Sequence, residues 1–342
     1  MTYPDKTIFM GGSMKRRSFL RGTSLAGASG ALGGLAHKET ADVQPAKKQS
    51  PAKLKIDPNR ILTLTGEYYR HYPVDFTKEK ESALGFKGWG ETIKIAAPAE
   101  ETALVLMHIW NVGISPELAW KPEGPAGGVM LMAEWAARTV PMIQNEIPPI
   151  LRTARKAGLP VIHVASSENY AKKYPGYRRT LSIAGTEPPG LPRAPLAEEK
   201  KSPDDRKDAL LFGERFPGSA GFYESHLDFP DEAKPLDTEP VAVTTHQFNA
   251  VLRDLGIWQL IYCGFAINWC LWFSPCGMCD MSRLGYRCSC IREGVTAVEN
   301  KASTHGEFNK EQALWRTSIM FGYIHNSPDF IQACGKLGPK RV

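Results

Sequence analysis

Short apolar runs alternate along this chain with longer segments in which apolar residues recur at helical spacing. Runs that are apolar throughout indicate strands buried on both faces of a sheet. Strands are expected at 61–64, 92–96, 102–107, 159–164, 240–245, 258–262 and 286–292. Helices are expected at 140–157, 249–255, 271–284, 308–323 and 329–334. Strands that alternate with helices predict a three-layer α/β/α fold around a mainly parallel sheet of about six strands.

Three of the expected strand ends carry side chains that could do chemistry. Parallel sheets place ligand sites at the carboxyl ends of their strands, and the ends of interest lie at His108, at Thr245–His246 and before Cys270. Cys270 follows Gly264 and opens an apparent helix, where free backbone N–H groups and the helix dipole favour a thiolate. The same turn can supply oxyanion donors beside the sulfur. Cys270 is therefore the principal candidate for a nucleophile.

Composition excludes several classes of protein. The 342 residues carry a formal net charge of +6, but the basic residues are concentrated near the N-terminus. No later cluster of Lys and Arg with aromatic residues indicates a nucleic-acid surface. The seven cysteines all fall in the last quarter of the chain, and an odd, clustered set does not predict a disulfide framework. We interpret the closely spaced pairs Cys276/Cys279 and Cys288/Cys290 as small buried residues rather than as ligands of a metal cluster.

The N-terminal segment has the pattern of an export signal rather than of a folded domain. Residues 14–21, Met-Lys-Arg-Arg-Ser-Phe-Leu-Arg, resemble a twin-arginine export signal, and a weakly apolar run follows them. Met14 is the expected start, and the run is too short and too glycine-rich to span a membrane. The signal implies a periplasmic or extracellular protein. The expected organisation is a signal region at 1–36, a linker at 37–60 and a folded domain at 61–342, with insertions near 114–137 and 166–239.

A match to a known family is carried by the segments 103–111, 155–164, 255–270 and 284–287. These segments resemble the isochorismatase-like cysteine hydrolases, which include nicotinamidases and N-carbamoyl amidohydrolases. That family uses an aspartate at the end of the first strand, a lysine at the end of the third strand, and a cysteine. Cys270 matches the cysteine, whereas His108 stands at the aspartate position and Thr245 or His246 at the lysine position.

The resemblance has two further implications. It implies a non-proline cis peptide in the cysteine turn, at Ala266–Ile267. Nicotinamidase-type members bind a metal through an Asp/His set after the second strand, and residues 165–169, Ala-Ser-Ser-Glu-Asn, carry no such set.

Three functional interpretations remain open from the sequence. In the first, an exported hydrolase cleaves a C–N bond of a small amide-type molecule through a thioester on Cys270, without a metal or other cofactor. His108 would be its base, and His246 the positive partner or a group that orients the substrate. The N–H groups of Ile267 and Cys270 would hold the oxyanion, and Asn268 would support the turn. The substrate pocket would draw on Trp110, Asn111, Thr245 and Trp269.

The second interpretation is a catalytically inactive relative that serves as a binding or scaffold protein, because both charged partners of the cysteine are replaced. The third is a metal site in which His108, His246 and Cys270 bind zinc or copper. The expected partner is a small-molecule substrate, and neither nucleic acid nor a membrane span is expected. The Trp- and Met-rich excursion at 114–137 also suits the subunit interface of a homo-oligomer.

Overall fold

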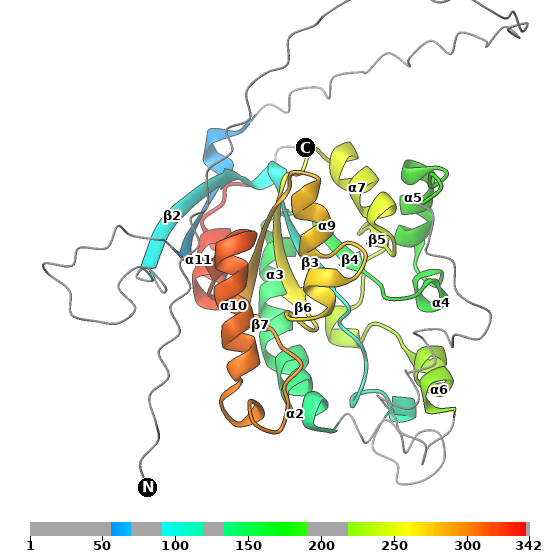
Figure 1. Ribbon diagram of the computed structural model, residues 1–342. Coiled ribbons are helices and arrows are strands. Elements are labelled where there is room, and N and C mark those ends of the chain that lie inside the picture. Colours follow the sequence, from blue (N-terminus) through cyan, green and yellow to red (C-terminus); the bar gives the residue numbers. More distant parts are fainter. Residues whose placement is uncertain (1–55, 70–90, 119–132, 191–217, 340–342) are drawn as a thin grey trace, which may run out of the picture. The chain divides into compact units, whose positions relative to one another are not determined.

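The computed structural model describes residues 56–69, 91–118, 133–190 and 218–339. The predicted export signal and most of the predicted linker lie outside these residues, as do large parts of both predicted insertions. Within the described residues, eight strands form one sheet in the order β2–β1–β8–β7–β6–β3–β4–β5 (Figure 1). The strands are β1 (Ile61–Tyr68), β2 (Glu91–Pro98), β3 (Thr102–Met107), β4 (Val161–Val164), β5 (Val241–Ala242), β6 (Gln259–Gly264), β7 (Arg287–Val295) and β8 (Ile324–His325).

The sheet is mainly parallel, as the alternation of strands and helices predicted. The six strands from β8 to β5 run parallel to one another. The β1–β2 hairpin adds an antiparallel edge beside β8, at the segments where two short strands were expected. Strand β8 was missed because its two residues, Ile324 and His325, are too few to make a recognisable pattern.

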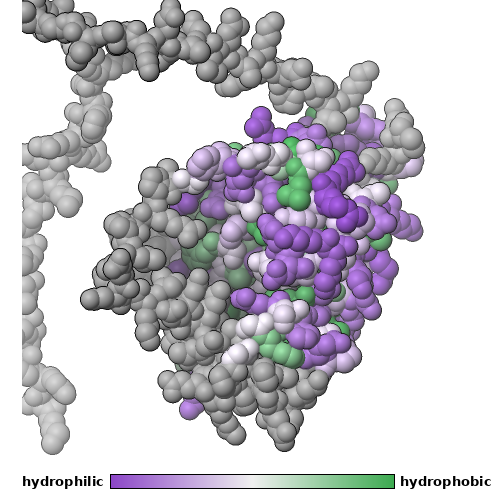
Figure 2. Space-filling view, turned by 90° about the vertical axis from the view of Figure 1, so that its right-hand side faces the viewer, coloured by the Kyte–Doolittle hydropathy of each residue, from purple (hydrophilic) through white to green (hydrophobic). Residues whose placement is uncertain are grey.

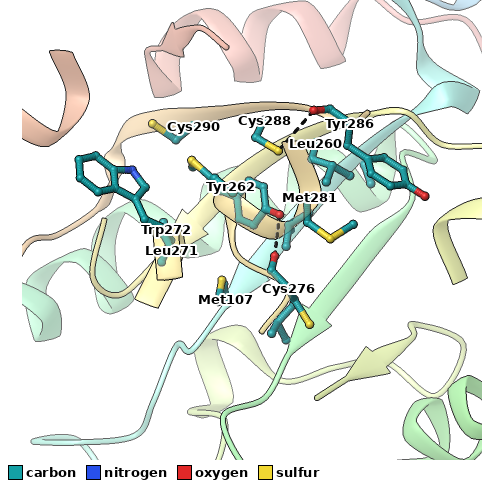
Figure 3. Close-up of a cluster of buried hydrophobic side chains, with 14 of the residues drawn as sticks. Met107, Leu260, Tyr262, Leu271, Trp272, Cys276, Met281, Tyr286, Cys288 and Cys290 are labelled. Carbon is teal, nitrogen blue, oxygen red and sulfur yellow. Dashed lines mark hydrogen bonds between the residues drawn. The ribbon is translucent and has the colours of Figure 1, made fainter. Parts of the chain in front are cut away.

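Helices cover both faces of this sheet, which confirms the three-layer prediction (Figure 1). On β3, Ala103, Val105 and Met107 point into one hydrophobic cluster, whereas Leu104 and Leu106 point into another. The first cluster includes residues of α7, α9 and α10, and Figure 3 shows part of it. The second includes residues of α3 and α11. The helices named here are α3 (Ile147–Lys156), α7 (Thr245–Asp254), α9 (Met278–Arg283), α10 (Phe308–Met320) and α11 (Ser327–Gly335).

The helix expected at 140–157 is longer and less regular than predicted. It comprises α2 (Ala133–Pro141), a π-helical turn over Met142–Glu146, and α3. Pro148 and Pro149 at the start of α3 have no N–H to donate to the preceding turn. The Ile147 N–H instead bonds the Met142 carbonyl, five residues back, which gives the π-helical turn.

The helix expected at 271–284 is broken in two. The structure has α8 (Cys270–Phe273) and α9, and between them Cys276 adopts a positive φ of 70°. Pro275 forces the break, because a residue that precedes proline is excluded from the helical region and Ser274 is extended, with a ψ of 160°. The Tyr262 hydroxyl donates to the Cys276 carbonyl at 2.8 Å and holds this linker against the sheet (Figure 3).

Further helices lie in the segment between β4 and β5, namely α4 (Glu168–Ala171), α5 (Pro175–Ala184) and α6 (Ser219–His226). Figure 2 shows the side of the molecule on which these helices lie. Its coloured residues are mostly hydrophilic, with apolar residues in small separate patches. No helix among the described residues is long and apolar enough to cross a membrane.

Candidate active site

The cysteine turn begins where β6 ends against β3. Gly264 has a φ of 137°, and a Cβ added there would lie 1.8 Å from the Met107 carbonyl oxygen, so only glycine fits. The next N–H, that of Phe265, donates to the same carbonyl at 3.2 Å. The chain then turns to Cys270, the first residue of α8. The cis peptide lies at Phe265–Ala266, one bond earlier than the resemblance implied.

The backbone donors at the thiol differ from those expected. The Ile267 N–H donates to the Thr296 carbonyl at 2.7 Å, so the predicted oxyanion donor is already engaged. Among the groups that favour the thiolate, the Ser274 side chain and then the backbone N–H groups of Ala266 and of Cys270 itself act to lower the pKa of Cys270. Two backbone donors therefore meet at the sulfur, with Ala266 in the place that we had given to Ile267.

Asn268 fixes this turn to the segment that follows β7. Its side-chain amide donates to the Val298 carbonyl at 2.9 Å and accepts from the Val298 N–H at 2.8 Å. Trp269, by contrast, is 50% exposed. The two residues that precede Cys270 are thus one anchor, Asn268, and one solvent-facing side chain, Trp269.

Burial keeps the Cys270 thiol protonated. Desolvation raises the pKa of Cys270 above its ordinary value, despite the hydrogen bonds that favour the thiolate. Helix α8 has only four residues, Cys270–Phe273, so its dipole is small. The thiolate expected from the sequence is therefore not the resting form at neutral pH.

His108 follows β3 directly and is held in an unusual conformation. Its φ is 53°, and its N–H donates to the Val164 carbonyl at 3.0 Å. Only 4% of the residue is exposed, and Nδ1 is buried without a hydrogen-bond partner among the described residues. Burial lowers the pKa of His108 to about 3, so the imidazole is neutral at pH 7. Strained backbone and unsatisfied buried polar atoms are both concentrated at functional sites.

An aromatic cluster joins His108 to the cysteine turn. The imidazole stacks on the Trp110 indole, with ring centroids 5.4 Å apart. Phe265, at the start of the cysteine turn, packs edge-on against the same indole at 6.0 Å, and both rings also pack against Trp135. Trp110 donates through Nε1 to the Ser166 hydroxyl at 3.0 Å, which fixes the indole in place. No hydrogen bond joins His108 to Cys270 among the described residues.

Tyr223 belongs to the same cluster, although no motif or periodicity pointed to it. It lies on α6, in the predicted insertion at 166–239, and its ring packs edge-on against Trp110 at 6.1 Å. Its hydroxyl oxygen is buried. Burial, and then negative charge on neighbours that include Cys270, raise the pKa of Tyr223 well above its ordinary value. The phenol therefore stays protonated within electrostatic range of the nucleophile.

The predicted partners from the third strand are not at the cysteine. Strand β5 ends at Ala242, and α7 starts at Thr245, earlier than expected, because Thr244 and Gln247 form a capping box. His246 therefore lies in the first turn of α7, where Nε2 is 2.9 Å from the Ala184 carbonyl of α5. In the part of the chain that the structure describes, it makes no hydrogen bond to Cys270.

Two residues predicted to line the pocket have structural contacts instead. The Thr245 hydroxyl donates to Asp280 at 2.8 Å and accepts from the Cys276 N–H at 2.9 Å, so it ties α7 to the linker before α9. The Asn111 amide bonds the His226 carbonyl at 3.2 Å and the Asp228 N–H at 2.9 Å, and so fixes the C-terminal end of α6. Asn111 also lines an open pocket of about 330 Å³ between segments 111–116 and 228–234.

The described residues contain no group of three or more His, Cys, Asp or Glu side chains that could hold a metal ion. His108, His246 and Cys270 thus do not form the predicted zinc or copper site. All seven cysteines are free thiols, and Cys276, Cys288 and Cys290 are buried in the core, as small core residues would be.

Comparison with known proteins identifies the family. Residues 129–325 match the model of the isochorismatase domain. The chain is 23% identical over 256 residues to the ureidoacrylate amidohydrolase RutB of Caulobacter segnis, covering 70% of this chain and 88% of that protein. It is 24% identical over 248 residues to RutB of Caulobacter vibrioides, covering 70% and 93%.

Solved structures similar to this chain include a cysteine hydrolase of Pseudomonas syringae, with 14% identity, a TM-score of 0.41 and coverage of 71% of this chain and 96% of the other. They also include N-carbamoylsarcosine amidase of Thermoplasma acidophilum, with 17% identity, a TM-score of 0.32 and coverage of 66% and 96%. Because the domain model matches more than half of its residues, this chain belongs to the isochorismatase-like cysteine hydrolase family.

Proposed function

We propose that this protein hydrolyses a C–N bond of a small amide-type molecule through a thioester on Cys270. Membership of the family supports this function, as does similarity to proteins named ureidoacrylate amidohydrolases over 70% of the chain. The observation that carries the proposal is local. The N–H groups of Ala266 and Cys270 both reach the sulfur at the carboxyl end of β6, where parallel sheets bind their ligands.

These two donors suit acyl transfer. When Cys270 attacks a carbonyl carbon, negative charge develops on the carbonyl oxygen, which must then lie close to the sulfur. Backbone N–H groups that already point to this position need no reorganisation during the reaction, which is what makes an oxyanion site effective. We assign the oxyanion site to Ala266 and Cys270, with Asn268 holding the turn that carries them.

His108 is the proposed proton acceptor. The Cys270 thiol is protonated at rest and must lose its proton as it attacks. With a pKa lowered to about 3, the buried imidazole is about as weak a base as an aspartate, whose ordinary pKa is about 3.9. A histidine at the aspartate position can therefore accept the thiol proton as an aspartate would, and it carries no charge before it does so. It holds the proton only briefly, so the proton must be passed on within the acylation step.

The lack of a positively charged side chain beside Cys270 among the described residues also bears on which substrates the site can bind. His246 bonds Ala184 rather than the cysteine, and no lysine or arginine of the described residues is among the groups that shift the pKa of Cys270 or of His108. Together with the aromatic cluster around Trp110, this favours an uncharged, planar ureido or amide substrate. We propose that no metal or other cofactor takes part.

A binding protein without catalysis is the second candidate, because the raised thiol pKa and the engaged His246 are also what a decayed site would have. Turnover of a panel of neutral ureido and N-carbamoyl compounds, measured as released ammonia or amine, separates the two. We expect turnover in the wild type and in Cys279→Ala, whose thiol is half-buried on α9, and none in Cys270→Ala. Binding of these compounds without turnover would favour the second candidate.

We also propose that the protein is exported by the twin-arginine route, on the basis of residues 14–21 alone. Replacement of Arg16 and Arg17 by lysine should leave the protein in the cytoplasm, as judged by cell fractionation. Export of this variant would contradict the proposal. A homo-oligomer stays a prediction, which the sedimentation velocity of the purified protein would test.

A further inference from the structure

Two side chains meet on the Trp110 indole from different parts of the chain. His108, from the end of β3, stacks on the indole with an interplanar angle of 18°, and Tyr223, from α6, packs edge-on against it at 83°. Phe265 packs on the same indole, and the next N–H in the chain, that of Ala266, bonds the Cys270 sulfur. The Tyr223 ring therefore packs on the same indole that contacts both His108 and the start of the cysteine turn.

Contacts with the segment that follows β3 hold α6 in place. Asn111 holds the carbonyl of His226 and the N–H of Asp228, on either side of the end of the helix. Leu227 and Phe229 follow and are almost fully buried. The hydroxyl oxygen of Tyr223 is shielded from solvent although part of its ring is accessible, so the phenol points into the protein. A buried phenol within electrostatic range of the nucleophile is a donor that bulk water does not replace.

We propose that the Tyr223 hydroxyl is the acid that protonates the leaving nitrogen when Cys270 is acylated. This inference rests on the proposed function and adds a catalytic residue to it. An amine is a poor leaving group unless it gains a proton as the C–N bond breaks. His108 can take the thiol proton, but a second group is needed at the nitrogen if attack and departure occur on different sides of the carbonyl carbon.

The protons balance in the acylation step. The Cys270 sulfur forms a bond to the carbonyl carbon, and its proton passes to His108. The C–N bond breaks, and the Tyr223 proton passes to the nitrogen. The His108 imidazolium then returns its proton to the phenoxide, directly or through water. The net change is thiol plus amide to thioester plus amine, with both side chains restored. Because burial disfavours charge on both Tyr223 and His108, return of the proton is strongly downhill.

Leaving groups of different basicity test this role. An amide needs protonation of its nitrogen, whereas a p-nitrophenyl ester of the same acyl group leaves as a stable anion. We expect Tyr223→Phe to lower kcat/KM for the amide by roughly 10²- to 10⁴-fold, the range typical of a lost general acid. For the ester the loss should be less than about threefold. Equal losses for amide and ester would overturn the proposal, because they would indicate a merely structural role.

Tyr174→Phe is the matched control. It removes another hydroxyl from the same insertion, one that donates to Asp228 at 2.6 Å. We expect it to treat amide and ester alike, and near-ultraviolet circular dichroism checks the fold of both variants. Wild-type protein that acylates Cys270 with the ester but shows no dependence of amide turnover on Tyr223 would refute the acid role alone. Wild-type protein that acylates Cys270 with neither compound would refute the proposed function and this inference with it.

Discussion

The imidazole of His108 lies parallel to the indole of Trp110, with the ring centroids 5.4 Å apart and the planes inclined at 18°. This stack removes the imidazole from water at the end of β3 and keeps it neutral. In the family that the chain resembles, a charged aspartate stands at this position. Under the proposed function, a neutral base of similar strength stands where that resemblance implies a charged one, and several measurable properties follow.

Stability should depend on pH through His108. Its pKa is about 3 in the folded protein against an ordinary value of 6.5, so between these pH values the unfolded chain binds a proton that the folded protein does not. Stability must therefore fall as the pH drops from 6.5 towards 3. Between pH 7 and pH 4.5 the wild type should lose about 2–3 kcal/mol more than His108→Asn, at about 1.4 kcal/mol per unit. Urea unfolding at the two pH values measures this. Equal losses would show that the imidazole is not buried as described.

The rate at which Cys270 is alkylated should keep rising with pH above neutrality. Burial raises the pKa of the Cys270 thiol above its ordinary value, so at pH 7 the thiolate is a small fraction. The rate of alkylation by iodoacetamide should increase about tenfold per pH unit from pH 7 to pH 9. Peptide-resolved mass spectrometry separates Cys270 from Cys279, which is also partly accessible. A rate that levels off by pH 7 would mean that the thiolate is stabilised after all.

His246 should be dispensable for catalysis. Its Nε2 bonds the Ala184 carbonyl at the end of α5, so His246→Ala loses a contact between two helices and no contact with the thiol. We expect kcat/KM to change less than about threefold and the free energy of unfolding to fall by about 1 kcal/mol. A loss of activity comparable to that of His108→Ala would mean that the imidazole reaches the substrate during turnover.

Several of these expectations could not have come from sequence alone. The parallel sheet could be predicted, because strands that are buried on both faces are apolar at every position and can be recognised by that. Thr244 followed three residues later by Gln247 is the pattern of a capping box, which predicts a helix that begins at Thr245 and includes His246. Tyr223 had no such signal, because its place beside Trp110 depends on how a long insertion folds back over the sheet. The raised pKa of Cys270 also depends on burial by residues distant in sequence.

The insertion is anchored by a buried ionic group that can be tested separately from catalysis. Glu239 accepts from Arg155 through both oxygens at 2.7 Å and lies 2.9 Å from His163 Nε2. Burial alone would raise the pKa of Glu239, but these partners lower it to about 2. Glu239→Gln should destabilise the protein by about 3–5 kcal/mol, because Arg155 loses its counter-charge in a largely buried setting.

Glu168→Gln is the control for this anchor. It removes a carboxylate from the exposed pair with Lys172, so its effect on the free energy of unfolding should be below about 1 kcal/mol. Urea unfolding at pH 7 compares the two variants. Similar small effects in both would indicate that the Glu239 network contributes little to the folded state.

The central claim is that Cys270 forms a thioester with an amide-type substrate. The most direct test is to mix the protein with a neutral ureido or N-carbamoyl compound that it turns over, quench with acid during turnover, and locate the acyl group by peptide mass spectrometry. The account predicts the acyl mass on the peptide containing Cys270, removable by hydroxylamine and missing in Cys270→Ala, which should also lack turnover. Turnover that persists in Cys270→Ala, or that proceeds with no acyl group on Cys270 under any quench time, would contradict it.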